Sequence, residues 1–245
     1  MFDILITVAP KDYNKLPFVM ESIVKNIKRY NNIHLVSNGC IPDDKIFCDA
    51  TLYLDSEILD YDFSKINNAE RRGWYRQQFI KLFQEITTDN YLVIDADAYI
   101  NRLFTINPAN PVFYLGRDQY HAPYFECFKR ICGLERVYPH SFISEIMFFK
   151  RGFIKHLLFH QQCDIPTFID RCVEAINYIN NGSGFSEYEF YGNYVSRARQ
   201  IVYQYQPINV MHQKKYRQWT DDEIKQYIRK YKDSNYDILT MHSWI

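Results

Sequence analysis

Residues Tyr91–Ala98 read YLVIDADA, and this stretch decides the fold that we expect for the chain. Four apolar residues in succession, Tyr91–Ile94, are typical of a strand that is buried on both faces, as in a parallel sheet covered by helices. Because side chains alternate along an extended chain, Asp95 and Asp97 point to the same side of that strand. Two carboxylates on one side suit a hard divalent cation that keeps open positions for substrate phosphates. The alternative is that the two aspartates only cap the next element.

Similar apolar runs alternate with helical patterns on both sides of this stretch. Runs bounded by turn residues predict strands at Phe2–Val8, Ile33–Ser37, Thr51–Leu54, Val112–Leu115 and Glu145–Phe149. Apolar residues at helical spacing predict helices at Leu16–Tyr30, Ala69–Ile86, Ile165–Asn180 and Asp221–Lys232. The alternation predicts an α/β fold with a mostly parallel central sheet flanked by helices. Ligands of such sheets bind at the carboxyl ends of the strands, where Thr7, Asn38 and Asp95 stand.

Composition narrows the class of protein. The 245 residues are 47% hydrophobic and 24% charged, which predicts one globular domain and excludes a disordered chain. Lys and Arg equal Asp and Glu at 29 each, so the chain lacks the basic surplus of a general nucleic-acid binder. No apolar run approaches the roughly 20 residues that span a bilayer, and the first residues lack the basic start of a secretory signal. The six cysteines show no zinc-site spacing, and free thiols fit a reducing compartment. We therefore expect a soluble, cytoplasmic protein.

A stripe of polar residues runs along one face of the predicted helix Ala69–Ile86. Trp74, Gln77, Gln78 and Lys81 stand at spacings of three, four and seven residues, so they share one face of the helix. Two amides and one ammonium group can bind sugar hydroxyls or phosphate. The alternative is an ordinary polar surface with Trp74 packed into the core.

Two further acidic positions and two histidines are candidates for chemistry. Residues 182–190 read GSGFSEYEF, a loop that enters a helix with Glu187 and Glu189 in its first turn, where the helix dipole also favours acids. Glu145 stands among apolar residues, where a carboxylate is costly to bury without a partner, for which Arg151 is one candidate. His242 and His212 are competing candidates for a metal ligand, because imidazole beside carboxylates suits Mn²⁺ better than Ca²⁺.

In their order along the chain, these motifs resemble GT-A nucleotide-sugar glycosyltransferases, in particular the small DxD-containing enzymes of bacteria and large DNA viruses. The resemblance covers nearly the whole chain and is carried by GWYRQQFIKL at 73–82, Asp95-Ala96-Asp97, SEYEFYGNY at 186–194 and His242-Ser243-Trp244. It implies a single GT-A (Rossmann-like) domain over residues 1–245. Residues 1–110 would form the nucleotide-sugar-binding half, which ends in the DxD motif. Residues 111–245 would form the acceptor-binding half, with a C-terminal closing segment.

The resemblance also implies roles for particular residues. Mn²⁺ or Mg²⁺ would bind to Asp95, Asp97 and His242. Glu187 would be the base that accepts the proton of the acceptor hydroxyl, with Glu189 as its neighbour, and the reaction would invert the sugar. In this chain Ser186 precedes Glu187, where the family has adjacent Glu and Asp. We expect the nucleotide-diphosphate sugar to bind to Thr7, Ala9, Asp55, Trp74, Gln77, Gln78, Lys81, Asp95, Ala96, Asp97, Glu145 and Lys214.

The expected activity is transfer of a hexose or pentose from a nucleotide-diphosphate sugar, with UDP as the first choice of nucleotide, to a hydroxyl of a glycan or glycoconjugate. We expect no nucleic-acid partner, and at most peripheral membrane contact through the basic end of helix Asp221–Lys232. One alternative is a haloacid-dehalogenase-like phosphohydrolase with Asp95 as nucleophile, although Tyr99 stands where that family has Thr or Val. Another is a non-catalytic carbohydrate- or nucleotide-binding protein.

Overall fold

The computed structural model describes residues 1–40, 50–117, 120–176, 183–197 and 203–243. The predicted end of helix Ile165–Asn180, Gly182 and Trp244 lie outside the described residues. In the part of the chain that is described, no helix has both the length and the apolar character needed to cross a membrane.

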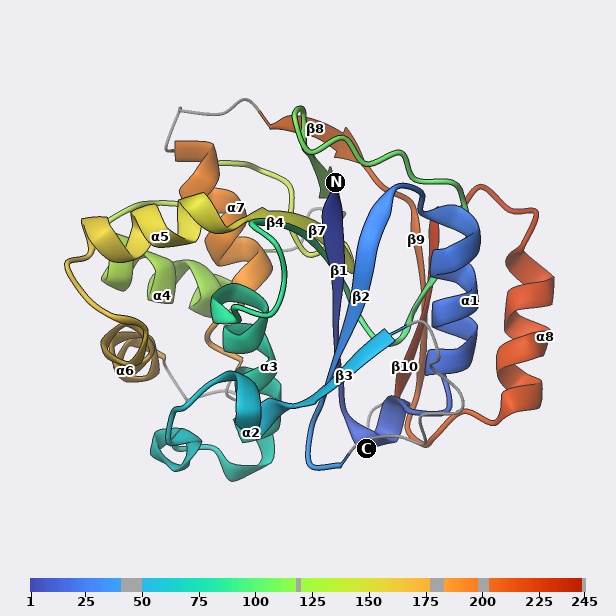
Figure 1. Cartoon of the computed structure of the whole chain (residues 1–245), viewed down its shortest axis with the longest axis horizontal. Helices are drawn as coiled ribbons and strands as arrows, with labels where there is room; N and C mark the ends of the chain where they lie inside the picture. The colour runs from blue at the N-terminus through green and yellow to red at the C-terminus, as the bar shows by residue number, and fades with distance from the viewer. Residues whose placement is uncertain (41–49, 118–119, 177–182, 198–202, 244–245) are drawn as a thin grey trace.

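A five-stranded sheet forms the centre of the molecule, in the order β3-β2-β1-β4-β7 (Figure 1). Its strands are β1 (Phe2–Val8), β2 (Tyr30–Ser37), β3 (Ala50–Leu54), β4 (Asn90–Ile94) and β7 (Ile146–Lys150). Neighbouring strands run parallel except for β7, which is antiparallel to β4. The structure therefore confirms the predicted α/β class with a mostly parallel central sheet.

Both faces of this sheet are buried, as the apolar runs require. Along β1 and β4, Leu5 and Val93 face one hydrophobic cluster, whereas Ile4 and Leu92 face another. The first cluster packs against α3 (Arg72–Phe83), α4 (Ala122–Cys132), α6 (Ile165–Ala175) and α7 (Glu187–Arg197), with α2 (Asp55–Ile58) and α5 (Arg151–His160) on the same side of the sheet (Figure 1). The second packs against α1 (Leu16–Asn26) and α8 (Asp221–Tyr231). Helices on both faces explain why β1 has no exposed residue.

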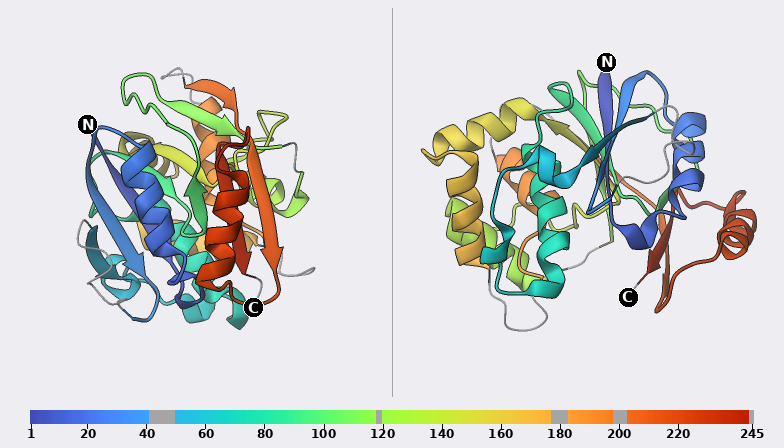
Figure 2. Two further views of the ribbon diagram at one scale, coloured as in Figure 1. Left: turned by 90° about the vertical axis from the view of Figure 1, so that its right-hand side faces the viewer. Right: turned by 60° about the horizontal axis from the view of Figure 1, so that its bottom comes forward.

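A second sheet of three strands, in the order β5-β10-β9, lies next to the central one. Its strands are β5 (Ala98–Ile100), β9 (Val210–Lys215) and β10 (Ile238–Ser243). β10 runs parallel to β9 and antiparallel to β5, and α8 connects β9 to β10 (Figure 2). Because β5 follows Asp97 directly, this sheet brings the C-terminal strand to the end of β4. A further pair joins β6 (Val112–Leu115) to β8 (Gln204–Pro207).

Several predicted boundaries were wrong by a few residues, and each has a local cause. α1 ends at Asn26 because Ile27 adopts an extended conformation and bridges to Phe104. α3 begins at Arg72, after a 3-10 turn, and ends where Gln84 becomes extended. β7 begins at Ile146 because Glu145 has a left-handed backbone with φ of 65°.

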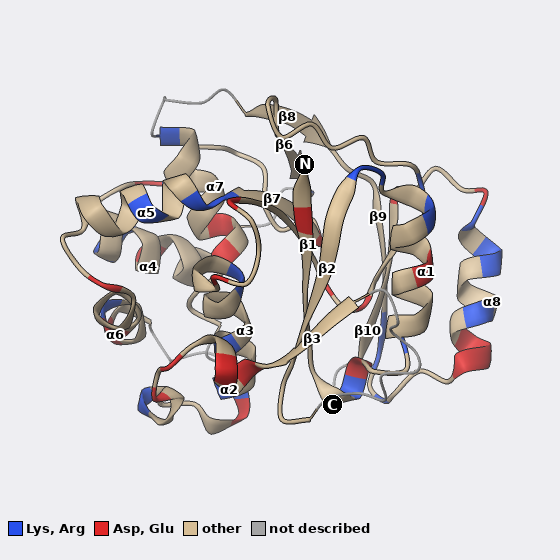
Figure 3. Ribbon diagram, in the orientation of Figure 1, with Lys and Arg blue, Asp and Glu red and all other residues tan. Residues whose placement is uncertain are grey.

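Charged side chains of α8 are segregated along its length (Figure 3). Its first turn holds Asp221, Asp222 and Glu223, and its last turn holds Arg229 and Lys230. This arrangement complements the helix dipole, which favours acids at the N-terminus and bases at the C-terminus.

Candidate active site

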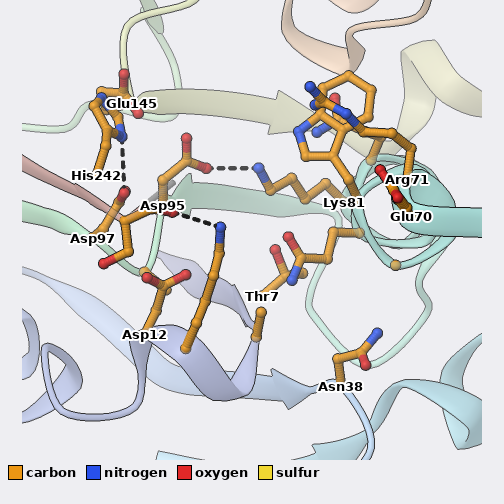
Figure 4. Close-up of a pocket in the computed structure, with 18 of the residues that line it drawn as sticks. Thr7, Asp12, Asn38, Glu70, Arg71, Lys81, Asp95, Asp97, Glu145 and His242 are labelled. Carbon is orange, nitrogen blue, oxygen red and sulfur yellow. Dashed lines mark hydrogen bonds and ion pairs between the residues drawn. The ribbon is translucent and has the colours of Figure 1, made fainter. Parts of the chain in front are cut away.

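A cleft of about 780 Å³ opens at the carboxyl ends of β1, β2 and β4 (Figure 4). Eleven of the predicted site residues line it, namely Thr7, Ala9, Trp74, Gln77, Gln78, Lys81, Asp95, Ala96, Asp97, Glu145 and His242. The polar stripe of α3 therefore faces the acidic end of β4. Asn38, which the sequence placed at a strand end where ligands bind, also lines the cleft. The prediction missed the other lining residues, namely Lys11, Asp12, Glu70, Arg71, Gly73, Tyr216 and Ser243.

The two aspartates after β4 are held by different partners. Asp95 accepts hydrogen bonds at Oδ1 from Lys81 Nζ at 2.6 Å and from the Tyr188 hydroxyl at 3.0 Å. Asp97 Oδ2 lies 2.9 Å from His242 Nδ1. Burial acts to raise the pKa of Asp97, but its hydrogen bond with His242 and the charge of that ring outweigh burial and hold the pKa at about 2. Asp97 is therefore ionised at neutral pH.

Lys81 is a buried cation between two carboxylates. Its ammonium group lies 2.6 Å from Asp95 Oδ1 and 2.8 Å from Glu187 Oε1, and 4.9 Å from the centre of the Tyr188 ring. Burial lowers the pKa of Lys81, but the two carboxylates raise it by more, so the net shift is upward. Lys81 therefore places a permanent positive charge at the wall of the cleft.

Glu187, the predicted base, is not among the residues that line the cleft. It is the first residue of α7, its side chain is 2% exposed, and it pairs with Lys81. Its backbone N–H donates to Gln78 Oε1 at 3.2 Å, so α7 is tied to the polar stripe of α3. Burial raises the pKa of Glu187 although Lys81 opposes that rise.

Besides His212, three other predicted residues lie outside the lining of the cleft. Glu189 is buried and accepts hydrogen bonds from the Ser141 hydroxyl at 2.6 Å and the Phe142 N–H at 3.2 Å, which joins α7 to the segment before β7. Asp55 is also buried, and it accepts hydrogen bonds from Asn38 at 2.9 Å and from an arginine of α3 at 3.0 Å. Asp55 therefore supports Asn38, which does line the cleft. Lys214 is exposed on β9, opposite His242 in the register of β9 and β10.

Glu145 lies in the cleft without the arginine partner that the sequence suggested. Arg151 donates instead to the backbone oxygens of Gln84 and Thr87. Glu145 is 6% exposed, and its pKa is raised well above the ordinary value by burial and then by the nearby charges of Asp95 and Asp97. A non-glycine residue with φ of 65° is uncommon and is often found where a side chain is held for function. Three carboxylates thus converge at the end of β4.

The imidazole and carboxylate groups near the end of β4 fit the ligands of a divalent metal ion. One nitrogen of His212, one nitrogen of His242 and one carboxylate oxygen of Glu145 lie within 4.8 Å of one another. Imidazole and carboxylate are the ligands that Mn²⁺, Fe²⁺, Co²⁺ and Zn²⁺ share in proteins. Asp95 and Asp97 add negative charge beside this group, so a cation would be electrostatically favoured there.

Two buried hydroxyl groups in the cleft have no hydrogen-bond partner among the described residues. They are Thr7 Oγ1, at the end of β1, and Ser243 Oγ, at the end of β10, and both residues are less than 5% exposed. Buried polar atoms in proteins are nearly always hydrogen-bonded. The two hydroxyls are therefore positioned to bind a polar ligand.

A family model described as a family of unknown function, DUF6492, matches residues 9–131, which is half of the chain. The chain belongs to the DUF6492 family. The part that matches DUF6492 contains the polar stripe of α3 and both aspartates after β4, whereas Glu145, His212 and His242 lie beyond it. No curated protein sequence matches this DUF6492 chain.

Solved structures with a similar chain path include two glycosyltransferases. The galactosyltransferase LgtC, in complex with donor and acceptor sugar analogues, is 11% identical with a TM-score of 0.49, over 97% of this chain and 86% of LgtC. Mouse xyloside xylosyltransferase 1 in its apo form is 10% identical with a TM-score of 0.49, over 98% of this chain and 97% of that one. At this level of similarity the activity of this DUF6492 protein has to be argued from its own residues.

Proposed function

We propose that the protein is a metal-dependent glycosyltransferase of the GT-A type, which moves a sugar from a nucleotide-diphosphate donor to a hydroxyl of a glycan or glycoconjugate. The observation that carries this proposal is the composition of one cleft. Asp95, Asp97 and His242 line it together with the amides and the ammonium group of α3, and His212 lies beside His242. Two buried hydroxyls in the same cleft have no hydrogen-bond partner among the described residues. A nucleotide-diphosphate sugar has groups for all three kinds of partner: phosphates for a metal ion, sugar hydroxyls for the amides, and a nucleoside for the buried hydroxyls. UDP is the nucleotide that we propose first.

The residues divide between the parts of such a donor. Thr7 and Ala9, at the end of β1, would bind the nucleoside. The Thr7 hydroxyl, which has no hydrogen-bond partner in the described part of the chain, would bond the ribose or the base. The amides of Gln77 and Gln78 would bond sugar hydroxyls, and Lys81 would add positive charge near the phosphates.

The cation would be held by the residues around Asp95, Asp97 and His242. When bound, a divalent cation supplies positive charge that stabilises the departing diphosphate.

In the proposed reaction, an acceptor oxygen forms a bond to the anomeric carbon while the bond from that carbon to the diphosphate oxygen breaks. The nucleoside diphosphate leaves with the electron pair, and the hydroxyl proton passes to a base. Glu187 is the proposed base, and the upward shift of its pKa makes it a stronger proton acceptor than an ordinary glutamate. Direct contact with an acceptor would require its pair with Lys81 to open. The anomeric configuration of the product, read by proton NMR, and the rate of Glu187→Gln test this role. Retention of configuration, or wild-type transfer by that variant, would remove Glu187 from it.

Thermal-shift screening of UDP, GDP and dTDP and their sugars, with and without Mn²⁺, tests the donor class. Ligand at 100 times its dissociation constant stabilises by about 2.7 kcal/mol, which for a chain of this size is a rise of roughly 5–11 °C. Asp97→Ala should remove the metal-dependent part of the rise, and Asp222→Ala, an exposed change in α8, should keep it.

Two outcomes would contradict the proposal. One is a Mn²⁺-dependent rise that Asp97→Ala leaves unchanged. The other is hydrolysis of simple phosphate esters with no response to any nucleotide, which would favour the phosphohydrolase.

A further inference from the structure

His212 and His242 reach the same point because of how β9 and β10 pair. The two strands are parallel, and Thr240 lies opposite His212. His242 is two residues beyond Thr240, so it projects from the same face of the sheet. As a result His212 Nδ1 lies 3.3 Å from His242 Nε2, with the Thr240 hydroxyl 3.2 Å from the first nitrogen and 3.1 Å from the second.

Asp97 determines which nitrogen of His242 is available. The Asp97 Oδ2 atom lies 2.9 Å from His242 Nδ1, a geometry that fits a hydrogen bond donated by Nδ1–H to the carboxylate. In a neutral ring the lone pair is then on Nε2, the atom that faces His212. A carboxylate that orients a histidine in this way is the usual neighbour of a metal-ligating imidazole.

The spacing of the two nitrogens also fits a shared ion. Two imidazole nitrogens at about 2.0–2.1 Å from one tetrahedral ion are about 3.3–3.4 Å apart, close to the observed 3.3 Å. Glu145 completes the group, with Oε1 3.9 Å from His212 Nδ1. The ammonium group of Lys81 pairs with Asp95 and Glu187. Among the described residues Lys81 forms no ion pair with Glu145, so the Glu145 carboxylate can bind another cation.

We propose that Glu145, His212 and His242 form a three-ligand site for a transition-metal dication, with Asp97 positioning His242 through Nδ1. This inference rests on the proposed function for its setting, since the site lies at the cleft that would take the diphosphate. It refines the ligand set there by adding Glu145 and His212, and by making Asp97 act through His242. Two imidazoles and one carboxylate select Mn²⁺, Co²⁺ or Zn²⁺ over Mg²⁺ and Ca²⁺, and they leave coordination positions open to phosphate oxygens.

Metal binding to the full chain tests this site without any sugar donor. After treatment with a chelator, titration calorimetry would measure the affinity for Mn²⁺, Zn²⁺ and Mg²⁺, and Co²⁺ would be followed by its visible absorption. His212→Asn and Glu145→Gln should each weaken Mn²⁺ and Zn²⁺ binding at least 100-fold and alter the Co²⁺ spectrum. Asp97→Asn should weaken binding by about 10–100-fold, as expected for a residue that only orients a ligand. His140→Asn, an exposed histidine outside the cleft, is the matched control and should bind like wild type.

The outcomes separate this site from the glycosyltransferase proposal. Wild-type metal affinity in His212→Asn, or equal affinity of the wild type for Mg²⁺ and Mn²⁺, would overturn the three-ligand site even if sugar transfer is observed. Loss of metal binding in His212→Asn would support the three-ligand site. If the wild type also turns over no nucleotide sugar, the transferase proposal is contradicted while the site stands. Circular dichroism and thermal melting of each variant confirm that it is folded.

Discussion

Replacing Lys81 by methionine is the sharpest test of how the candidate active site is held together. Lys81 is 5% exposed and bonds Asp95 at 2.6 Å and Glu187 at 2.8 Å. Methionine keeps much of the side-chain volume but removes the charge, so the carboxylates that the ammonium compensates lose their partner. Breaking a buried ion pair by removing one partner costs about 3–5 kcal/mol. For a domain of this size that is a fall in melting temperature of roughly 6–20 °C.

The measurement is urea unfolding followed by circular dichroism, together with calorimetry, at neutral pH and without added metal. Lys65→Met is the control, because Lys65 pairs with Asp170 at 2.8 Å in an exposed position where such pairs contribute up to about 1 kcal/mol. The double variant Lys81→Met with Glu187→Gln should be more stable than Lys81→Met alone, since it removes the less exposed of the two unpaired charges.

Two results would refute this reasoning. One is a loss below about 1 kcal/mol in Lys81→Met, similar to the exposed control. The other is a double variant that is no more stable than the single one, which would mean that Glu187 does not depend on Lys81 for its burial.

Three more predictions follow from contacts in the cleft and the core. Glu145→Gln should make the melting temperature of the metal-free protein depend less on pH above the ordinary pKa of a glutamate. The native protein holds the Glu145 proton more tightly than the unfolded chain does. The stability due to this residue is therefore present below the ordinary pKa of glutamate and is lost as the pH rises through the raised pKa. An equally steep pH dependence of the melting temperature in the wild type and in Glu145→Gln would contradict this. Gly73→Ala should weaken nucleotide binding with little change in melting temperature, because the added methyl would lie 3.3 Å from the Asn38 amide in the cleft; unchanged nucleotide affinity would show that Asn38 adjusts freely. Gly192→Ala should cost several kcal/mol or prevent folding, because its methyl would overlap the ring of Phe142, and a melting temperature within a few degrees of wild type would contradict that packing.

Sequence patterns were informative where a property is local. The runs that form β1 and β4 are continuous and apolar because both faces of those strands are covered, and this signal is independent of the rest of the chain. The stripe of α3 was likewise readable from spacing alone, and all four of its residues line the cleft.

Properties that depend on distant partners were not readable. β9 reads VMHQKK and has no apolar pattern, so only its pairing with β10 makes it a strand. The same pairing, across about thirty residues, is what brings His212 beside His242. Glu187 was found as an acid at a helix start, but its partner Lys81 is 106 residues away, so its burial could not be foreseen.

The position of β10 between β5 and β9 has a consequence for synthesis. Asp97 precedes His242 by 145 residues, and chains generally fold from the N-terminal side as they are made. Asp95 and Asp97 are therefore synthesised long before β9 and β10, the strands that carry His212 and His242, leave the ribosome. Only the insertion of β10 between β5 and β9 brings the proposed metal ligands together. A nascent chain would therefore not bind a transition metal at this site until that sheet has formed.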